Sequence, residues 1–360
     1  MVNVKKLLIV LVLFVMTFGT GLSVFAEEDE ITFEDEALEL VIRNEIDKPN
    51  DPIYKSDVEG ITTLDASSWD IESLKGIEHL SALKNLNLAG NNISDISPLE
   101  DLTKLVVLRL NDNQIDDISP LETLTRLEAL YLSDNSINEL SPLSDLDKLT
   151  TLQLSNNELQ YINALKDLKK LTNLYLDDNK INEIDALKDL TKLEVLRLNN
   201  NLLTEINPLQ NLSNLKVLRL FGNPISHIVP LGGLSNLEVL LLNHAQVSDV
   251  SALKGLTNLS VLYLEENNIS DISALSNLDN LNQLTLAGNK VNDFSPTESY
   301  YHNLVHSDFN LDGETDDKSE EASDNESSSN TLTYILIAFV LLQTFALFYV
   351  FTNMKGSRRG

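Results

Sequence analysis

Leucine and isoleucine return with a period of 22 residues through the middle of the chain. The first full unit places its apolar and amide positions at Leu83, Leu86, Leu88, Asn91, Ile93, Ile96, Leu99 and Leu102. The same residue classes recur every 22 positions, without insertion or deletion, up to Phe294. A degenerate unit starting at Ile61 precedes them, so eleven units fill residues 61–296. Self-similarity at this period predicts a solenoid in which each unit packs only on its neighbours.

Each unit contains the elements of one solenoid turn. The two leucines of its Leu-x-Leu segment alternate with residues that point the other way, which predicts a short strand. One unit cannot bury these leucines alone, so neighbouring strands must pair in parallel at about 4.8 Å. Further along, a column of Ser, Asn and Asp that includes Ser97 precedes a column that is often proline, as at Pro98. These two columns are interpreted as the N-cap and N1 positions of a 3₁₀-like turn on the return limb.

The consensus Leu-x-x-Leu-x-Leu-x-x-Asn-x-Ile resembles the leucine-rich repeat. Its 22-residue form, with Asp-Ile-Ser-Pro-Leu at residues 95–99 and 117–121, is similar to bacterial internalin-type surface proteins over roughly residues 30–296. The resemblance implies an α/β solenoid, a leucine-rich repeat horseshoe with a parallel concave sheet, 3₁₀-like convex limbs and a helical N-terminal cap. It also implies that the inner Asn of each unit bonds backbone groups of adjacent turns. Ala245 interrupts this Asn column, so one rung should be missing there.

Both open ends of a solenoid need a cover. Residues 27–60 are the predicted N-terminal cap, in which Thr32 and Asp35 read as a capping-box variant at a helix start. The apolar residues that follow at helical spacing are Leu38, Val41, Ile42 and Ile46. At the other end, the residues available to cover the last turn are Phe294, Tyr300, Tyr301, Leu304 and Val305.

The two ends of the chain read as targeting and membrane segments. Residues 1–26 combine two lysines, an apolar run and a small-residue site at Val24-Phe25-Ala26, which is typical of a secretory signal peptide; an uncleaved N-terminal anchor is the alternative. Residues 331–353 are apolar and long enough to span a membrane, and the basic tail 354–360 indicates a cytoplasmic C-terminus. Residues 297–330 then form an acidic linker. We therefore expect a single-pass cell-membrane protein with its repeats outside the cell.

Charge and composition exclude several function classes. The chain has 55 Asp and Glu against 26 Lys and Arg, a net charge of −29, which argues against nucleic acid as a partner. There is no cysteine, so disulfides, thiolate nucleophiles and Cys-ligated zinc are excluded. The five histidines fall in no catalytic motif, and the Ser and Asp residues occupy repeat columns. The sequence therefore predicts a protein that is not an enzyme and needs no cofactor.

One segment matches part of a calcium-binding loop of the EF-hand type. Oxygen-bearing residues stand at loop positions 1, 3, 5, 7 and 9, with Gly313 at position 6, and they are Asp308, Asn310, Asp312, Glu314 and Asp316. Position 12 is Ser319, where such loops place a bidentate Glu. Calcium binding and an acidic linker without metal both stay open.

The residue between the two strand leucines of each unit points onto the concave face. Three of the seven arginines of the chain and three of the four tyrosines of the repeats fall in this one column. Tyr and Arg dominate binding hot spots, and Phe221 is interpreted as an exposed aromatic beside them. The predicted ligand-binding residues are Arg109, Tyr131, Gln153, Tyr175, Arg197, Arg219, Phe221, Leu241, His244 and Tyr263. An unliganded sheet surface is the structural alternative, because Tyr also favours strands.

These features predict a membrane-anchored surface protein that holds a protein or glycan ligand on its concave face, in adhesion. The alternative is a membrane-proximal scaffold that organises envelope proteins of the same cell. The short linker expected at 297–330 favours this alternative, because an adhesin between cells needs reach.

Overall fold

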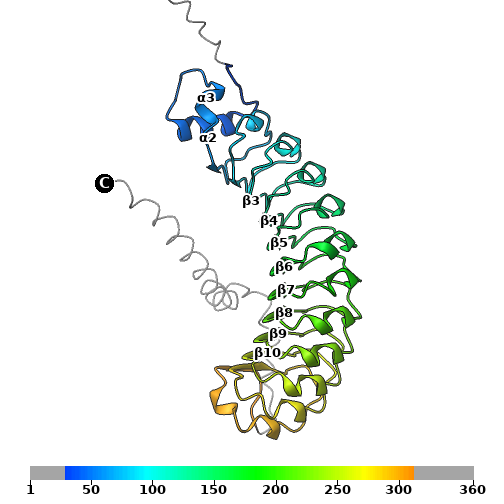
Figure 1. Cartoon of the computed structure of the whole chain (residues 1–360). Helices are drawn as coiled ribbons and strands as arrows, with labels where there is room; N and C mark the ends of the chain where they lie inside the picture. Colours follow the sequence, from blue (N-terminus) through cyan, green and yellow to red (C-terminus); the bar gives the residue numbers. More distant parts are fainter. Residues whose placement is uncertain (1–28, 312–360) are drawn as a thin grey trace, which may run out of the picture.

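Twelve short strands lie side by side in one parallel sheet along the inner edge of a curved arc (Figure 1). They belong to a computed structural model that describes residues 29–311. The predicted signal peptide, membrane span and cytoplasmic tail lie outside these residues. Within 29–311, no helix has the length and apolar character needed to cross a membrane.

The strands follow one another in chain order, each three residues long except the last. They are β1 Thr63–Asp65, β2 Asn85–Asn87, β3 Val107–Arg109, β4 Ala129–Tyr131, β5 Thr151–Gln153, β6 Asn173–Tyr175, β7 Val195–Arg197, β8 Val217–Arg219, β9 Val239–Leu241, β10 Val261–Tyr263, β11 Gln283–Thr285 and β12 His306–Ser307. Strands β1 to β11 pair at offsets of 22 residues, as in Leu174↔Leu196. The middle leucine of each of these strands is buried, which confirms the predicted parallel concave sheet.

The outer limb of each turn is a short 3₁₀ helix. These helices are η1 Ile77–His79, η2 Ser97–Leu99, η3 Ser119–Leu121, η4 Ser141–Leu143, η5 Asn163–Asp167, η6 Asp185–Leu187, η7 Asn207–Asn211, η8 Val229–Gly233, η9 Ser251–Gly255, η10 Ser273–Leu275, η11 Ser295–Thr297 and η12 Tyr301–Asn303. The predicted 3₁₀-like limbs are confirmed, and so is the horseshoe.

The predicted N-cap role of the serine column is wrong. Ser97 is already inside η2, the cap position is Ile96, and no side chain bonds the helix from there. The carboxylate of Asp95 instead accepts the backbone N–H of Ser97 at 2.8 Å. The same contact recurs from Asp117, Glu139, Asp249, Asp271 and Asp293 to the first residue of their helices. The side chain that bonds the start of each 3₁₀ helix therefore lies two positions before the serine column, because an acidic side chain can reach forward to that N–H.

A ladder of buried asparagines connects the turns, as predicted. Asn201 donates its amide to the carbonyls of Leu176 and Leu198 and accepts the N–H of Ile181 at 3.0 Å. Ala245 cannot do this, and the rung is missing there as expected. The N–H of Ile225, which an asparagine at 245 would bind, donates to the carbonyl of Asn223 at 2.8 Å.

Two helices cover the N-terminal end of the core. They are α2 Glu36–Ile46, which buries Leu38, Val41 and Ile42, and α3 Lys55–Val58. The predicted capping role of Thr32 is wrong, because Asp35 is the N-cap of α2. One Asp35 oxygen accepts the N–H groups of Ala37 and Leu38, and the other accepts those of Glu72 and Ser73. Asp35 therefore fastens the cap to the first repeat.

Replacing Asp35 by alanine is expected to lower the free energy of unfolding by about 2 kcal/mol, because four backbone donors lose a charged acceptor. Burial opposes the charge of Asp35, but these four donors outweigh it and lower the pKa below 3.8. Its stabilisation is therefore present above pH 3.8 and is lost as the pH falls through the lowered value. In urea unfolding, the free energy of unfolding of the wild type should exceed that of Asp35→Ala at pH 7, and this difference should be smaller at pH 3. Glu36→Gln, on the exposed side of the same turn, should change neither value; an equal loss would show a general charge effect.

The C-terminal end carries a twelfth strand that the repeat pattern did not reveal. β12 pairs with β11 at an offset of 23 residues, Leu284↔Ser307, so one inserted residue hides the unit. Residues 297–311, which the sequence assigned to an acidic linker, are therefore folded. Tyr300 and Phe294 are buried as expected, and Phe309, not Val305, completes the cover. Phe309 stacks on Phe294 with ring centroids 4.7 Å apart, while Val305 is 87% exposed.

Candidate functional site

The third residues of strands β1 to β11 form one line across the concave face. We call it the concave column, and its members in register order are Asp65, Asn87, Arg109, Tyr131, Gln153, Tyr175, Arg197, Arg219, Leu241, Tyr263 and Thr285. Eight of the ten predicted ligand-binding residues belong to it and are half-buried. Because neighbouring strands lie about 4.8 Å apart, a partner can contact several of them at once.

Two arginines of the concave column lie over neighbouring tyrosine rings. The guanidinium of Arg109 is 4.8 Å from the ring centroid of Tyr131, and that of Arg197 is 5.5 Å from the centroid of Tyr175. Each cation–π contact stabilises both side chains in one orientation. The column therefore presents Tyr and Arg as pre-ordered pairs, which lowers the entropy cost of binding.

A buried carboxylate supports the centre of the column, and sequence reasoning missed it. Asp177 is 2% exposed and its Oδ2 is 2.7 Å from Nε of Arg197. The backbone N–H of Asn199 donates to its other oxygen at 3.0 Å, and the Ser155 hydroxyl contacts Oδ2 at 3.3 Å. Burial raises the pKa of Asp177, although Arg197 acts in the opposite direction. Its column otherwise holds mainly Ser, Asn and Ala, so a lone Asp next to the arginines was the signal available in the sequence.

Arg219 stands next to Arg197 in the register. Burial is the main cause that lowers the pKa of Arg219, and the neighbouring Arg197 acts in the same direction. Two like charges on adjacent strands are unfavourable. The pair therefore concentrates positive charge on the concave face of an acidic molecule.

The remaining predicted residues, Phe221 and His244, lie beside the column on its C-terminal side. Phe221 is half-buried, not exposed as the sequence suggested, because the His244 ring packs edge-on against it at 5.2 Å. His244 has φ 53°, the left-handed conformation that recurs at this place in most units, as at Asp178 and Asn200. Its position is thus dictated by the turn as well as by the surface.

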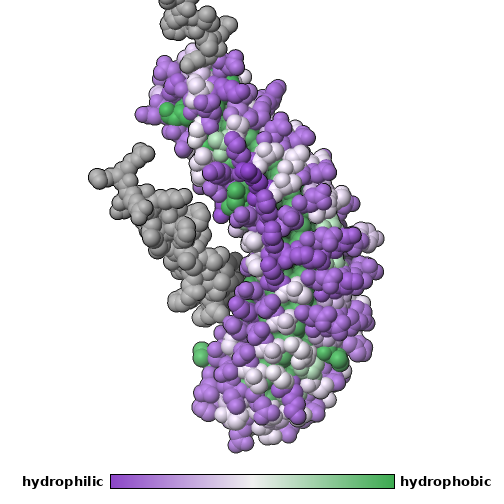
Figure 2. Space-filling view, in the orientation of Figure 1, coloured by the Kyte–Doolittle hydropathy of each residue, from purple (hydrophilic) through white to green (hydrophobic). Residues whose placement is uncertain are grey.

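An apolar strip runs next to the arginines on the first residues of β7 to β9. Val195, Val217 and Val239 are adjacent in register and half-buried, and Leu241 adds to them in the concave column. The visible surface in Figure 2 is mostly hydrophilic. A half-buried apolar strip on the sheet surface therefore gives the concave face a contact area for an apolar group.

The column ends in a second polar group. The Tyr263 hydroxyl donates to Gln283 at 2.6 Å, and its ring lies 6.2 Å from that of His306. Burial raises the pKa of the neighbouring Glu265 and of Tyr263. Tyr263 is therefore engaged with Gln283 and His306 near the C-terminal end of the sheet.

The structure describes only the first part of the predicted calcium-binding segment. Both carboxylate oxygens of Asp308 accept backbone N–H groups, from Leu286 at 2.7 Å and from Ala287 at 2.8 Å. Asp308 therefore ties the end of β12 to the segment that follows β11. Asp312, Glu314 and Asp316 lie outside the described residues. Within 29–311, no cluster of three His, Asp or Glu side chains could hold a metal ion.

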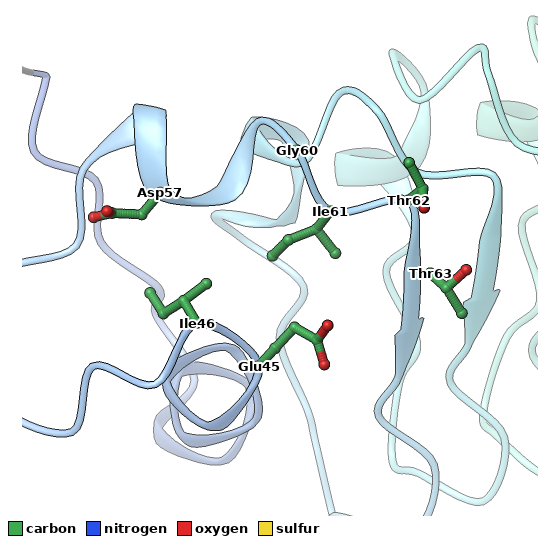
Figure 3. A pocket seen from close by; sticks show the side chains of 7 residues that line it. All are labelled: Glu45, Ile46, Asp57, Gly60, Ile61, Thr62 and Thr63. Carbon is green, nitrogen blue, oxygen red and sulfur yellow. The ribbon is translucent and has the colours of Figure 1, made fainter. Parts of the chain in front are cut away.

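A shallow hollow lies between the N-terminal cap and β1. Figure 3 shows Ile46 and Ile61 facing one another across it, with Glu45 extended toward the strand. The residues that line it are Glu45, Ile46, Asp57, Gly60, Ile61, Thr62 and Thr63. Asp57 is held by Lys48 at 2.7 Å, so this hollow offers less binding chemistry than the concave column.

Sequence profiles of leucine-rich repeats match much of the solenoid. The profile described as "Leucine Rich repeats (2 copies)" matches residues 81–123, 169–211 and 257–298, and "Leucine rich repeat" matches 125–181. The solved internalin InlF from Listeria monocytogenes is 30% identical over 80% of this chain and 99% of its own, with a TM-score of 0.59. The chain belongs to the internalin-like leucine-rich repeat proteins.

Two further solved structures share the fold. Internalin C2 from Listeria monocytogenes is 34% identical over 59% of this chain and 94% of its own, with a TM-score of 0.57. The plant peptide hormone receptor RGFR1, solved in complex with RGF2, shares the fold at 23% identity over 71% of this chain and 49% of its own, with a TM-score of 0.62. No curated protein sequence matches the chain. The internalin-like repeats are a protein-interaction fold, which gives this chain a protein-binding role.

Proposed function

We propose that this internalin-like protein holds a protein ligand against its concave column at the cell surface. The predicted signal peptide at 1–26 directs it out of the cell, and the predicted span at 331–353 anchors it with residues 354–360 in the cytoplasm. On this proposal the protein acts in adhesion. Organisation of envelope proteins of the same cell is the alternative outcome of the test.

The alignment of tyrosine and arginine in one register line is the observation that supports this proposal most. Arg109 with Tyr131, and Arg197 with Tyr175, are half-exposed pairs whose orientation is set by contacts within the column. Such pre-ordered Tyr and Arg side chains are the kind that contribute most to protein–protein affinity. The concave strip of Val195, Val217 and Val239 adds apolar area beside them.

The test compares binding of the full-length protein, purified in mild detergent, with that of a Tyr131→Ala/Tyr175→Ala variant. Loss of a hot-spot side chain costs about 2 kcal/mol, or about thirtyfold in affinity. The variant should therefore bind its partner at least thirtyfold more weakly in surface-plasmon measurements. Tyr161→Ala is the matched control, because Tyr161 is a repeat tyrosine on the outer limb that is 60% exposed. Arg197 is left intact, since its loss would strand the buried charge of Asp177.

Three binding surfaces separate the outcomes: envelopes of the source cell, intact cells of other kinds, and isolated glycans. Binding to foreign cells that only the double variant loses supports adhesion through the concave column. Binding confined to the source envelope and lost in the same variant supports the scaffold. Equal binding by the double variant and the wild type would place the binding surface elsewhere.

A further inference from the structure

The centre of the concave column holds more positive than negative charge. Asp177 is engaged by Arg197, with 2.7 Å between Oδ2 and Nε. Within residues 29–311, no carboxylate lies within ion-pair distance of Arg219. The charge of Arg197 is thus paired with a carboxylate, whereas the charge of Arg219, the next residue in register, is not.

Among the arginines of the concave column, Arg219 alone has, within residues 29–311, neither a carboxylate at ion-pair distance nor a tyrosine ring under its guanidinium. Asp177 acts electrostatically on Arg219, but from beyond ion-pair distance, and its carboxylate is engaged by Arg197. A half-buried arginine that lacks a carboxylate and stands beside another arginine destabilises the free protein. The charge of Arg219 therefore lowers the stability of the free protein, and a bound anion would remove this destabilisation.

The surroundings of Arg219 indicate which anion would fit. A guanidinium has a planar set of N–H donors that matches a carboxylate with two parallel hydrogen bonds. Val217 precedes it by two residues on the same strand face, and Val239 and Leu241 occupy the paired positions on β9. A peptide segment with a carboxylate next to an apolar side chain complements this arrangement in both charge and polarity.

We propose that Arg219 binds a carboxylate of the protein ligand, with an adjoining apolar side chain on Val217, Val239 and Leu241. This proposal rests on the proposed function and names the chemistry that the concave column recognises. The carboxylate comes from an Asp or Glu side chain or from the C-terminus of the ligand, and both sources present the same group. Arg197 with Asp177 is the balanced neighbour that holds the surface in place.

The test observes the arginine directly in the full-length protein, labelled with ¹⁵N at the arginine Nε positions. The chain has seven arginines, so the spectrum is simple, and Arg219→Lys identifies the Arg219 signal by its disappearance. The probes are N-acetyl-Val-Glu-Val-amide, N-acetyl-Val-Gln-Val with a free carboxylate, N-acetyl-Val-Gln-Val-amide, and inorganic phosphate as an anion without a peptide. We expect the Arg219 signal to shift saturably with one or both acidic peptides and not with the neutral one. The two acidic probes distinguish a side-chain source from a C-terminal source.

A second measurement separates ligand binding from a structural role. Arg219→Gln should weaken acidic-peptide binding at least tenfold while leaving the urea midpoint of unfolding unchanged or higher, because it removes an unbalanced charge. Arg126→Gln, at an exposed site outside the concave column, should change neither quantity. An Arg219 signal that ignores the acidic peptides, that shifts equally with the neutral peptide, or that shifts only with inorganic phosphate would overturn the proposal. A lower midpoint in Arg219→Gln would do so as well.

The two proposals fail in different ways. If Tyr131→Ala/Tyr175→Ala loses the protein partner but Arg219→Gln binds it normally, the concave column is the binding surface and the carboxylate proposal is wrong. If acidic peptides shift Arg219 but no protein partner is lost in the tyrosine variant, the carboxylate site stands and the proposed function is wrong.

Discussion

Replacing Leu174 by aspartate is expected to abolish cooperative folding of the central repeats. Leu174 is fully buried between Leu152 and Leu196 in the register of β5, β6 and β7. Removing its side chain costs about 2–5 kcal/mol, and burying an unpaired carboxylate costs several more. The sum is comparable with the total stability of an ordinary domain, about 5–15 kcal/mol. In a solenoid the damage also spreads, because each unit is stabilised by its two neighbours.

The matched control is Asn173→Asp, one residue earlier on the same strand. Asn173 is half-buried on the concave face, so the same charge is introduced at a side chain that stays in contact with water. Circular dichroism, urea unfolding and hydrogen exchange of β5 to β7 should show a native protein for Asn173→Asp and loss of protection for Leu174→Asp. A normal unfolding curve for Leu174→Asp would contradict the assigned register.

The repeat period determined most of the fold in advance because it fixes which residues are neighbours. Residues 22 apart occupy the same place on adjacent turns, so the concave column can be predicted from the sequence alone. Pairs such as Tyr175↔Arg197 follow directly from that arithmetic. The period did not reveal the twelfth unit, because one inserted residue shifts its Leu304, Ser307 and Phe309 out of the 22-residue spacing.

Features that depend on how far a side chain reaches were harder to predict. The carboxylate of Asp35 spans two elements to bind Ser73, 38 residues away, and no local pattern marks that contact. The burial of Asp177 has no local signal in the sequence, because polar residues are mostly exposed. Its burial follows from packing between Ser155, Asn199 and Arg197, which are 20 to 22 residues away in the sequence. The column arithmetic brings these residues together but does not assign their depth.

Removing one rung of the asparagine ladder should cost more than any other polar substitution considered. Asn201 is 3% exposed and bonds the backbone groups of Leu176 and Ile181 on the preceding turn and of Leu198 on its own turn. In Asn201→Ala the buried N–H of Ile181 loses its acceptor, which alone costs about 1–3 kcal/mol. The carbonyls suffer less, because Asn179 and Asn223 still donate to Leu176 and Leu198. We expect a loss of about 3 kcal/mol in urea unfolding, against less than about 0.5 kcal/mol for the exposed Asn182→Ala.

At Ala245, where the asparagine ladder is interrupted, a missing rung can be added to the same molecule. In Ala245→Asn the new amide should donate to the carbonyls of Leu220 and Leu242, which each receive one asparagine now. Its oxygen should take the N–H of Ile225 from the carbonyl of Asn223. The net gain should be about 1 kcal/mol, since hydrogen bonds in the folded state replace bonds to water in the unfolded state.

The double variant tests whether the rungs act independently. Positions 201 and 245 are two turns apart, about 10 Å along the sheet, so their effects should add to within about 0.5 kcal/mol. Asn201→Ala/Ala245→Asn is therefore expected to lie about 2 kcal/mol below the wild type. A destabilising Ala245→Asn would show that the turn at 222–225 is built around the missing rung. In that case the missing asparagine at position 245 helps to set the conformation of the surface that carries Phe221 and His244, because restoring the ladder would disturb that conformation.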